Sequence, residues 1–107
     1  MLIRGIVLAM RPDWEVLEVD NGPDALQTAL DSVFDYASID INMPGMDGLT
    51  LAGHLRAECP QMRLCMLSAN IQAASQQRAA ELGAGFVRKP INKAAVIDLI
   101  RYFEAGT

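Results

Sequence analysis

The chain has 107 residues, about the length of one small globular domain, and half of them are apolar with few aromatic side chains. The formal net charge is −4, and the basic residues form no cluster. This argues against nucleic-acid binding, which needs clustered Lys and Arg.

Neither a membrane-spanning segment nor a set of disulfide bonds is expected. The first ten residues, "MLIRGIVLAM", are apolar, but they are too few to span a bilayer, contain Arg4 and precede no small-residue cleavage site. Cys59 and Cys65 fit neither a metal-ligand spacing nor a disulfide framework. The sequence therefore predicts two reduced thiols and a cytoplasmic location.

The N-terminal third alternates helix, strand and helix. Apolar side chains at helical spacing predict a helix over residues 2–10, which Pro12 ends. "WEVLEV", residues 14–19, alternates apolar and acidic side chains and is predicted to be a strand. The turn "DNGPD" then places Pro23 at the start of a second helix, whose apolar stripe extends to Val33.

The middle of the chain gives two further strands around a helix. "YASIDI", residues 36–41, is predicted to be a strand. A helix follows between Gly48 and Pro60, with Asp47 as its N-cap. "RLCMLS", residues 63–68, is nearly all apolar, the pattern of a strand covered on both faces.

The C-terminal third continues the alternation. An alanine-rich helix is predicted over residues 71–84, closed by Gly83, and "GFV" follows as a short strand over residues 85–87. An apolar stripe from Val96 to Phe103 marks the last helix. The strict order of helices and strands predicts an α/β fold with a doubly wound parallel sheet, in which ligands bind at the carboxyl ends of the strands.

Three polar side chains are expected to meet at that edge. Asp40 lies at the end of one predicted strand, Ser68 ends the next, and Lys89 follows the one after. The carboxylate could attack a phosphorylated donor and form an aspartyl-phosphate, while the amine and the hydroxyl bind the phosphoryl oxygens. Taken singly, each has a simpler role: a turn cap, a strand-end hydrogen bonder and a solvated lysine.

Three motifs together resemble the receiver domain of two-component response regulators, which has a flavodoxin-like fold. The motifs are "DINMPGMDG", "LSAN" and "GAGFVRKP", and the resemblance covers essentially the whole chain. It implies that Asp40 is the phosphoacceptor and that Asp40 and the backbone carbonyl of Asn42 are Mg²⁺ ligands. It also implies switch roles for Ser68 and Phe86 and a phosphate-binding role for Lys89, with a cis peptide bond before Pro90.

The sequence departs from this family at its beginning. Receivers open with an apolar strand that ends in two acidic Mg²⁺ ligands, and here the sequence opens inside the first helix. Asp13 and Glu15 come after that helix and cannot replace the acidic pair. We therefore expect weakened Mg²⁺ binding and an N-terminally incomplete receiver fold, rearranged or domain-swapped.

The missing strand would lie inside the sheet, in the family's order 2-1-3-4-5, and its loss would leave buried backbone groups unpaired at roughly 1–3 kcal/mol each. Three outcomes are open. Neighbouring strands could close the gap in a shifted order, another chain could supply a strand in a homodimer, or residues 1–10 could fill the gap as an antiparallel strand. The dimer is the preferred outcome.

The expected function is that of a single receiver domain over residues 1–107, with no effector domain, no membrane and no nucleic-acid contact. It would accept a phosphoryl group on Asp40 from a histidine kinase or a phosphotransfer protein, and it would not be an enzyme beyond self-catalysed transfer. An alternative is a receiver-like interaction module that no longer binds Mg²⁺ or is no longer phosphorylated efficiently. A phosphohydrolase resembling the haloacid dehalogenases is disfavoured, because Asn42 stands where those enzymes place a second aspartate.

Overall fold

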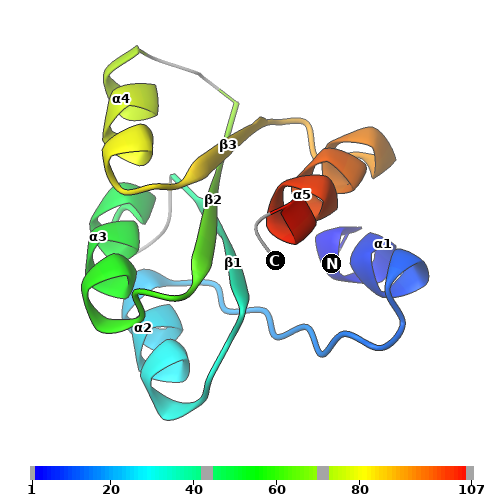
Figure 1. Cartoon of the computed structure of the whole chain (residues 1–107), viewed down its shortest axis with the longest axis horizontal. Coiled ribbons are helices and arrows are strands. Elements are labelled where there is room, and N and C mark those ends of the chain that lie inside the picture. Colours follow the sequence, from blue (N-terminus) through cyan, green and yellow to red (C-terminus); the bar gives the residue numbers. More distant parts are fainter. Residues whose placement is uncertain (1, 42–44, 70–72, 106–107) are drawn as a thin grey trace.

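The computed structural model describes residues 2–41, 45–69 and 73–105, which form five helices and three strands (Figure 1). In chain order these are α1 (Leu2–Met10), α2 (Gly22–Asp31), β1 (Tyr36–Asp40), α3 (Gly48–Glu58), β2 (Arg63–Ser68), α4 (Ala73–Glu81), β3 (Gly85–Arg88) and α5 (Lys93–Ala105). The strands form a parallel sheet in the order β1-β2-β3. The predicted α/β class and parallel sheet are confirmed. Over the described ranges, no helix has the length and apolarity needed to cross a membrane.

Helices cover both faces of the sheet, with α2, α3 and α4 on one face and α1 and α5 on the other (Figure 1). The side chains of β2 alternate between the two layers. Leu64 and Met66 belong to the core beneath α3, whereas Cys65 packs with Leu99 and Phe103 of α5. Burial on both faces explains why β2 is a continuous apolar run rather than an alternating one.

The helix ends follow their local sequence. The side chain of Asn21 caps α2 by accepting the N–H of Asp24 at 2.9 Å. Asp47 caps α3 by accepting the N–H of Thr50 at 3.0 Å, as predicted. Gly83 closes α4 with a φ of 68°, a conformation that glycine adopts at little cost.

The prediction of a strand over residues 14–19 is wrong. That stretch forms no ladder, although it alternates as a strand would. Trp14 and Val16 pack against the cluster that joins α1 to α5, while Glu15 and Glu18 are exposed. The alternation of apolar and acidic residues therefore indicates that one side of this segment is buried. It does not indicate that the segment pairs with a neighbouring strand.

Two of the three outcomes expected at the gap are also wrong. No shifted strand order closes it, because β1 pairs with β2 alone among the described segments. Residues 2–10 do not fill it as a strand either, since they form α1, and Val7 of that helix packs against Val96 and Ile100 of α5. Supply of a strand by another chain stays a prediction.

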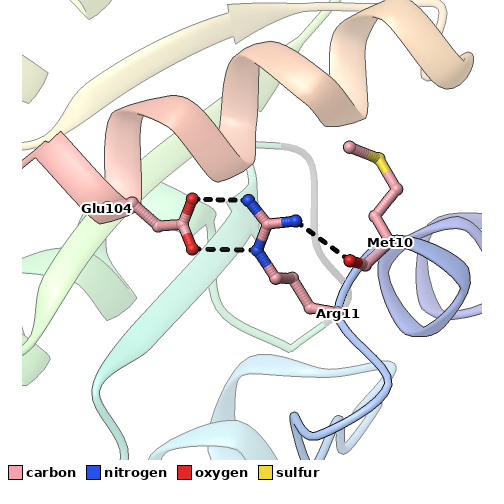
Figure 2. A network of polar contacts seen from close by, with 3 residues as sticks. All are labelled: Met10, Arg11 and Glu104. Carbon is pink, nitrogen blue, oxygen red and sulfur yellow. Dashed lines mark hydrogen bonds and ion pairs between the residues drawn. The ribbon is translucent and has the colours of Figure 1, made fainter.

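An ion pair joins the end of α1 to the last turns of α5 (Figure 2). Arg11 binds both carboxylate oxygens of Glu104, with Nη2 at 2.7 Å from Oε1 and Nε at 2.9 Å from Oε2. Its remaining nitrogen, Nη1, donates to the carbonyl of Met10 at 2.9 Å. The hydrogen bond from Arg11 lowers the pKa of Glu104 below its usual value. Both ends of the described chain therefore pack together on the same face of the sheet.

Candidate functional site at the carboxyl edge of the sheet

The three parallel strands end at one edge, where the predicted site residues lie. Asp40 is the last residue of β1, Ser68 is the last residue of β2, and Lys89 follows β3 directly. The ladder places Asp40 opposite Leu67 and Ser68 opposite Arg88. The backbone N–H of Lys89 donates to the carbonyl of Ser68 at 2.9 Å, which extends the pairing past the end of β3.

The structure brings the carboxylate and the amine into direct contact. Lys89 Nζ donates to Asp40 Oδ2, and the two form an ion pair between residues 49 positions apart in the chain. Both side chains are about one-third exposed, so the pair is open to a ligand from solvent. The peptide bond between Lys89 and Pro90 is cis, as the resemblance implied. This arrangement concentrates a carboxylate and a cation where a phosphoryl group could bind.

Ser68 and Phe86 lie at different depths near this edge. Ser68 is buried, with 4% of its surface exposed. Phe86 is half-buried, stands opposite Met66 in the ladder, and packs against the core on the side of α3 and α4. Phe86, Lys89 and Pro90 help to line a hollow of about 370 Å³ beside the start of α5. Lys89 and residues of β3 therefore border a common hollow beside α5.

Glycine at position 48 allows the loop after β1 to return close to the site. The N–H of Gly48 donates to the carbonyl of Ile41 at 2.8 Å. A Cβ at position 48 would lie 2.2 Å from the carbonyl oxygen of Asp40, which is a severe overlap with backbone. This positioning role was not predicted from the sequence. Its signal is the glycine directly after the capping acid, Asp47, in "MPGMDG". Asn42, the predicted backbone ligand of Mg²⁺, lies outside the described residues.

The described residues provide few ligands for a metal ion. No group of three or more His, Cys, Asp or Glu side chains gathers within them. Asp13 and Glu15 line a cavity together with Asp35, which directly precedes β1 at the opposite edge of the sheet. Mg²⁺ in phosphoryl-transfer sites is commonly held by one or two carboxylates together with phosphate oxygens and water. Among the described residues, Asp40 could supply one carboxylate to such a site.

A parallel sheet covered by helices on both faces, with an acid–lysine pair at its carboxyl edge, defines a doubly wound α/β domain. The sequence model of the response regulator receiver domain matches residues 2–101, and the chain belongs to this family. The resemblance found in the sequence is confirmed.

Solved structures show the same fold. Chemotaxis protein CheY4 of Vibrio cholerae is 26% identical, with a TM-score of 0.79 over 94% of this chain and 88% of that one. The REC domain of AraT, a response regulator from Geobacillus stearothermophilus, is 25% identical, with a TM-score of 0.85 over 97% of this chain and 82% of that one. The described chain is therefore a CheY-like receiver fold.

Curated relatives are longer than this chain. Transcriptional activator protein ExaE of Pseudomonas putida is 30% identical over 92 residues, which is 85% of this chain and 43% of that protein. The putative positive transcription regulator BvgA of Bordetella pertussis is 31% identical over 102 residues, which is 94% of this chain and 49% of that protein. The chain thus spans less than half the length of these two relatives.

Proposed function

We propose that this receiver accepts a phosphoryl group on Asp40 from a phosphohistidine of a histidine kinase or a phosphotransfer protein. A carboxylate oxygen of Asp40 would attack phosphorus, the phosphorus–nitrogen bond to the donor would break, and the electron pair would leave with the imidazole, which takes up a proton from solvent. The contact between Lys89 Nζ and the Asp40 carboxylate supports the proposal, because a cation beside this carboxylate could neutralise the oxygens of a phosphoryl group carried on it.

Signalling would follow from a change in Ser68 and Phe86. In this proposal, the hydroxyl of Ser68 hydrogen-bonds a phosphoryl oxygen, and Phe86 repacks in response. The surface formed by β3 and the start of α5 would then change shape. A bound Mg²⁺ would supply additional charge neutralisation at Asp40 and Asn42. The proposed output is a two-state surface rather than catalysis of a second reaction.

A second candidate is an interaction module that takes up phosphate poorly. The observation that favours it is that no group of three or more His, Cys, Asp or Glu side chains that could hold a metal ion lies among the described residues. In both candidate functions the chain would act through partner proteins. One possible partner is a second copy of the chain, which would form a homodimer by sharing a strand across the gap in the sheet. A cytoplasmic location is proposed from the free thiols of Cys59 and Cys65.

Intact-mass measurement after incubation with acetyl phosphate and Mg²⁺ tests the phosphoacceptor. The expected result is the addition of one phosphoryl group to the wild-type chain and none to an Asp40→Asn variant. Because one protein carboxylate binds Mg²⁺ weakly, we expect the reaction to need millimolar Mg²⁺. An unmodified wild-type chain at saturating Mg²⁺ would favour the interaction module, and a modified Asp40→Asn chain would refute Asp40 as acceptor.

A further inference from the structure

The loop that follows Asp40 touches the first turn of α2. Helices α2 and α3 lie side by side on one face of the sheet, and the loop enters α3 at Gly48 (Figure 1). Gly22, the first residue of α2, is buried. A Cβ at position 22 would lie 2.4 Å from the Cβ of Met46 and 3.2 Å from its carbonyl oxygen, whereas ordinary van der Waals contact begins near 3.4 Å. The two backbones are therefore closer than any side chain at position 22 would allow.

A change of side-chain rotamer cannot relieve this close approach. The nearest atom of Met46 is its Cβ, which is fixed to the backbone, so a side chain at position 22 would push the helix and the loop apart by about 1 Å. The neighbouring residues also approach each other closely, since a Cβ on Gly45 would lie 3.1 Å from Cδ of Pro23. Two consecutive residues of α2 therefore lie against two consecutive residues of the loop.

The first turn of α2 is fixed by its own sequence. The side chain of Asn21 accepts the N–H of Asp24 at 2.9 Å, and the backbone carbonyl of Asn21 accepts the N–H of Ala25 at 3.1 Å. The ring of Pro23 fixes one backbone angle of this turn. On the other side of the contact, Met46 packs against the core beneath α3. The loop is thus held between a fixed helix end and the core.

The same loop is bound to the backbone at Asp40. The N–H of Gly48 donates to the carbonyl of Ile41, the residue after Asp40, at 2.8 Å, and a Cβ at position 48 would overlap with the carbonyl of Asp40. Because a single residue separates Met46 from Gly48, a shift of Met46 by about 1 Å reaches the backbone that carries the Asp40 carboxylate. Phosphoryl transfer depends mainly on positioning, and a displacement of about 1 Å can slow a reaction by about a hundredfold.

We infer that the first turn of α2 positions Asp40 for phosphoryl transfer, with Gly22 and Pro23 as positioning residues that act through Gly45 and Met46 of the loop. The inference rests on the proposed function and goes beyond it, because neither Gly22 nor Pro23 is among the groups that would bind the phosphoryl group. A contact that served packing alone would change the stability of the fold and leave the reactivity of the folded chain at Asp40 unchanged.

Gly22→Ala tests this role. Its rate of phosphorylation by acetyl phosphate and Mg²⁺, measured by time-resolved intact mass on chain that circular dichroism shows to be folded, should fall by at least about tenfold. Gly53→Ala is the matched control, because it makes the same change in α3 at a position where a Cβ would meet nothing within 4 Å, and its rate should stay within about twofold of wild type. Val7→Ala destabilises the chain at the contact between α1 and α5 and should also keep the rate. A Gly22→Ala rate equal to that of wild type, or an equal loss in Val7→Ala, would overturn the inference.

A rescue variant tests the contact itself. Met46→Gly removes the Cβ that a methyl group at position 22 would strike, and the carbonyl oxygen of residue 46, at 3.2 Å, then needs to shift by only a few tenths of an ångström. Adding Gly22→Ala to Met46→Gly should therefore change the rate by less than about twofold, and the full loss in that background would contradict the contact.

Pro23→Ala replaces Gly22→Ala if that variant does not fold. It keeps the Asn21 cap, removes the ring beside Gly45 and should slow phosphorylation by at least about threefold. An unchanged rate in Pro23→Ala would then overturn the inference.

Hydrogen exchange at Gly48 gives a readout that does not require phosphorylation. The Gly48 amide is bonded to the carbonyl of Ile41, so Gly22→Ala should quicken its exchange and Gly53→Ala should not. Unchanged protection of Gly48 in Gly22→Ala would overturn the inference. If acetyl phosphate leaves the wild type unmodified, the proposed function fails and the inference fails with it. If the wild type is modified and Gly22→Ala reacts equally fast, the inference alone fails.

Discussion

At the scale of single residues, the site depends on one cation held against one carboxylate. Lys89→Ala removes the charge that contacts Asp40 but leaves the backbone bond from residue 89 to Ser68. Because the amine neutralises the transferred phosphoryl group, we expect the rate of phosphorylation by acetyl phosphate to fall by at least about tenfold while the fold is retained. Time-resolved intact mass gives the rate. Lys93→Ala, in the first turn of α5, is the matched control, and an equal loss there would contradict a specific role for Lys89.

The two thiols differ because only one of them is buried. Burial raises the pKa of Cys65 to about 12, and its side chain is fully enclosed between β2 and α5. The thiolate is the reactive form, so the native chain should resist iodoacetamide at Cys65 at pH 8. Cys59 is half-buried at the end of α3 and should react first. Peptide mapping checks this order, and rapid modification of Cys65 before unfolding would contradict the described core.

At the scale of elements, α3 depends on its N-cap. Asp47→Ala should lower the free energy of unfolding by about 1 kcal/mol, because the N–H of Thr50 loses its acceptor. Hydrogen bonds from the backbone and hydroxyl of Thr50 lower the pKa of Asp47 below 3.8 in the folded state. The contribution of the charged cap is therefore present above the unfolded pKa and is lost as the pH falls through the folded pKa.

Chemical denaturation between pH 7 and pH 3 measures this contribution. Asp47→Asn keeps a capping acceptor but does not titrate, so it should lose the part of the pH dependence that Asp47 causes. An identical pH dependence in Asp47→Asn and the wild type would contradict the assignment of that titration to the cap.

Local patterns predicted the helices better than they predicted the sheet. Helical spacing and caps such as Asp47 depend on neighbours a few residues away, so all five helices were predicted from the sequence. A strand needs a partner, and the alternation of residues 14–19 says nothing about whether one is present. Asp40, Ser68 and Lys89 were predicted to share an edge because parallel strands end together. The overlap avoided at Gly48 involves the backbone of Asp40, and the glycine after the capping acid hints at it without naming that partner.

At the scale of the whole molecule, α1 is held on α5 by apolar packing and by one exposed ion pair. Val7 is buried against Val96 and Ile100, so Val7→Ala should lower the free energy of unfolding by about 2 kcal/mol at any pH where the chain is folded. Glu104→Gln removes the charge that pairs with Arg11, and exposed ion pairs contribute little to stability. Apolar packing, rather than the ion pair, should therefore dominate the docking of α1.

The pH dependence distinguishes the two contributions. Arg11 lowers the pKa of Glu104 in the folded state, so the contribution of the ion pair is present above the unfolded pKa of that carboxyl group and is lost as the pH falls through the folded value. Hydrogen exchange of the α1 amides should therefore quicken slightly in wild type as the pH is lowered through this range, after correction for intrinsic rates, and Glu104→Gln should lack this step. Val7→Ala should quicken the exchange of the α1 amides by more than Glu104→Gln does. The increase should be the same above and below the pH range in which Glu104 titrates. If Glu104→Gln released α1 as fully as Val7→Ala at neutral pH, the ion pair and not the apolar contact would hold the N-terminal helix on the sheet.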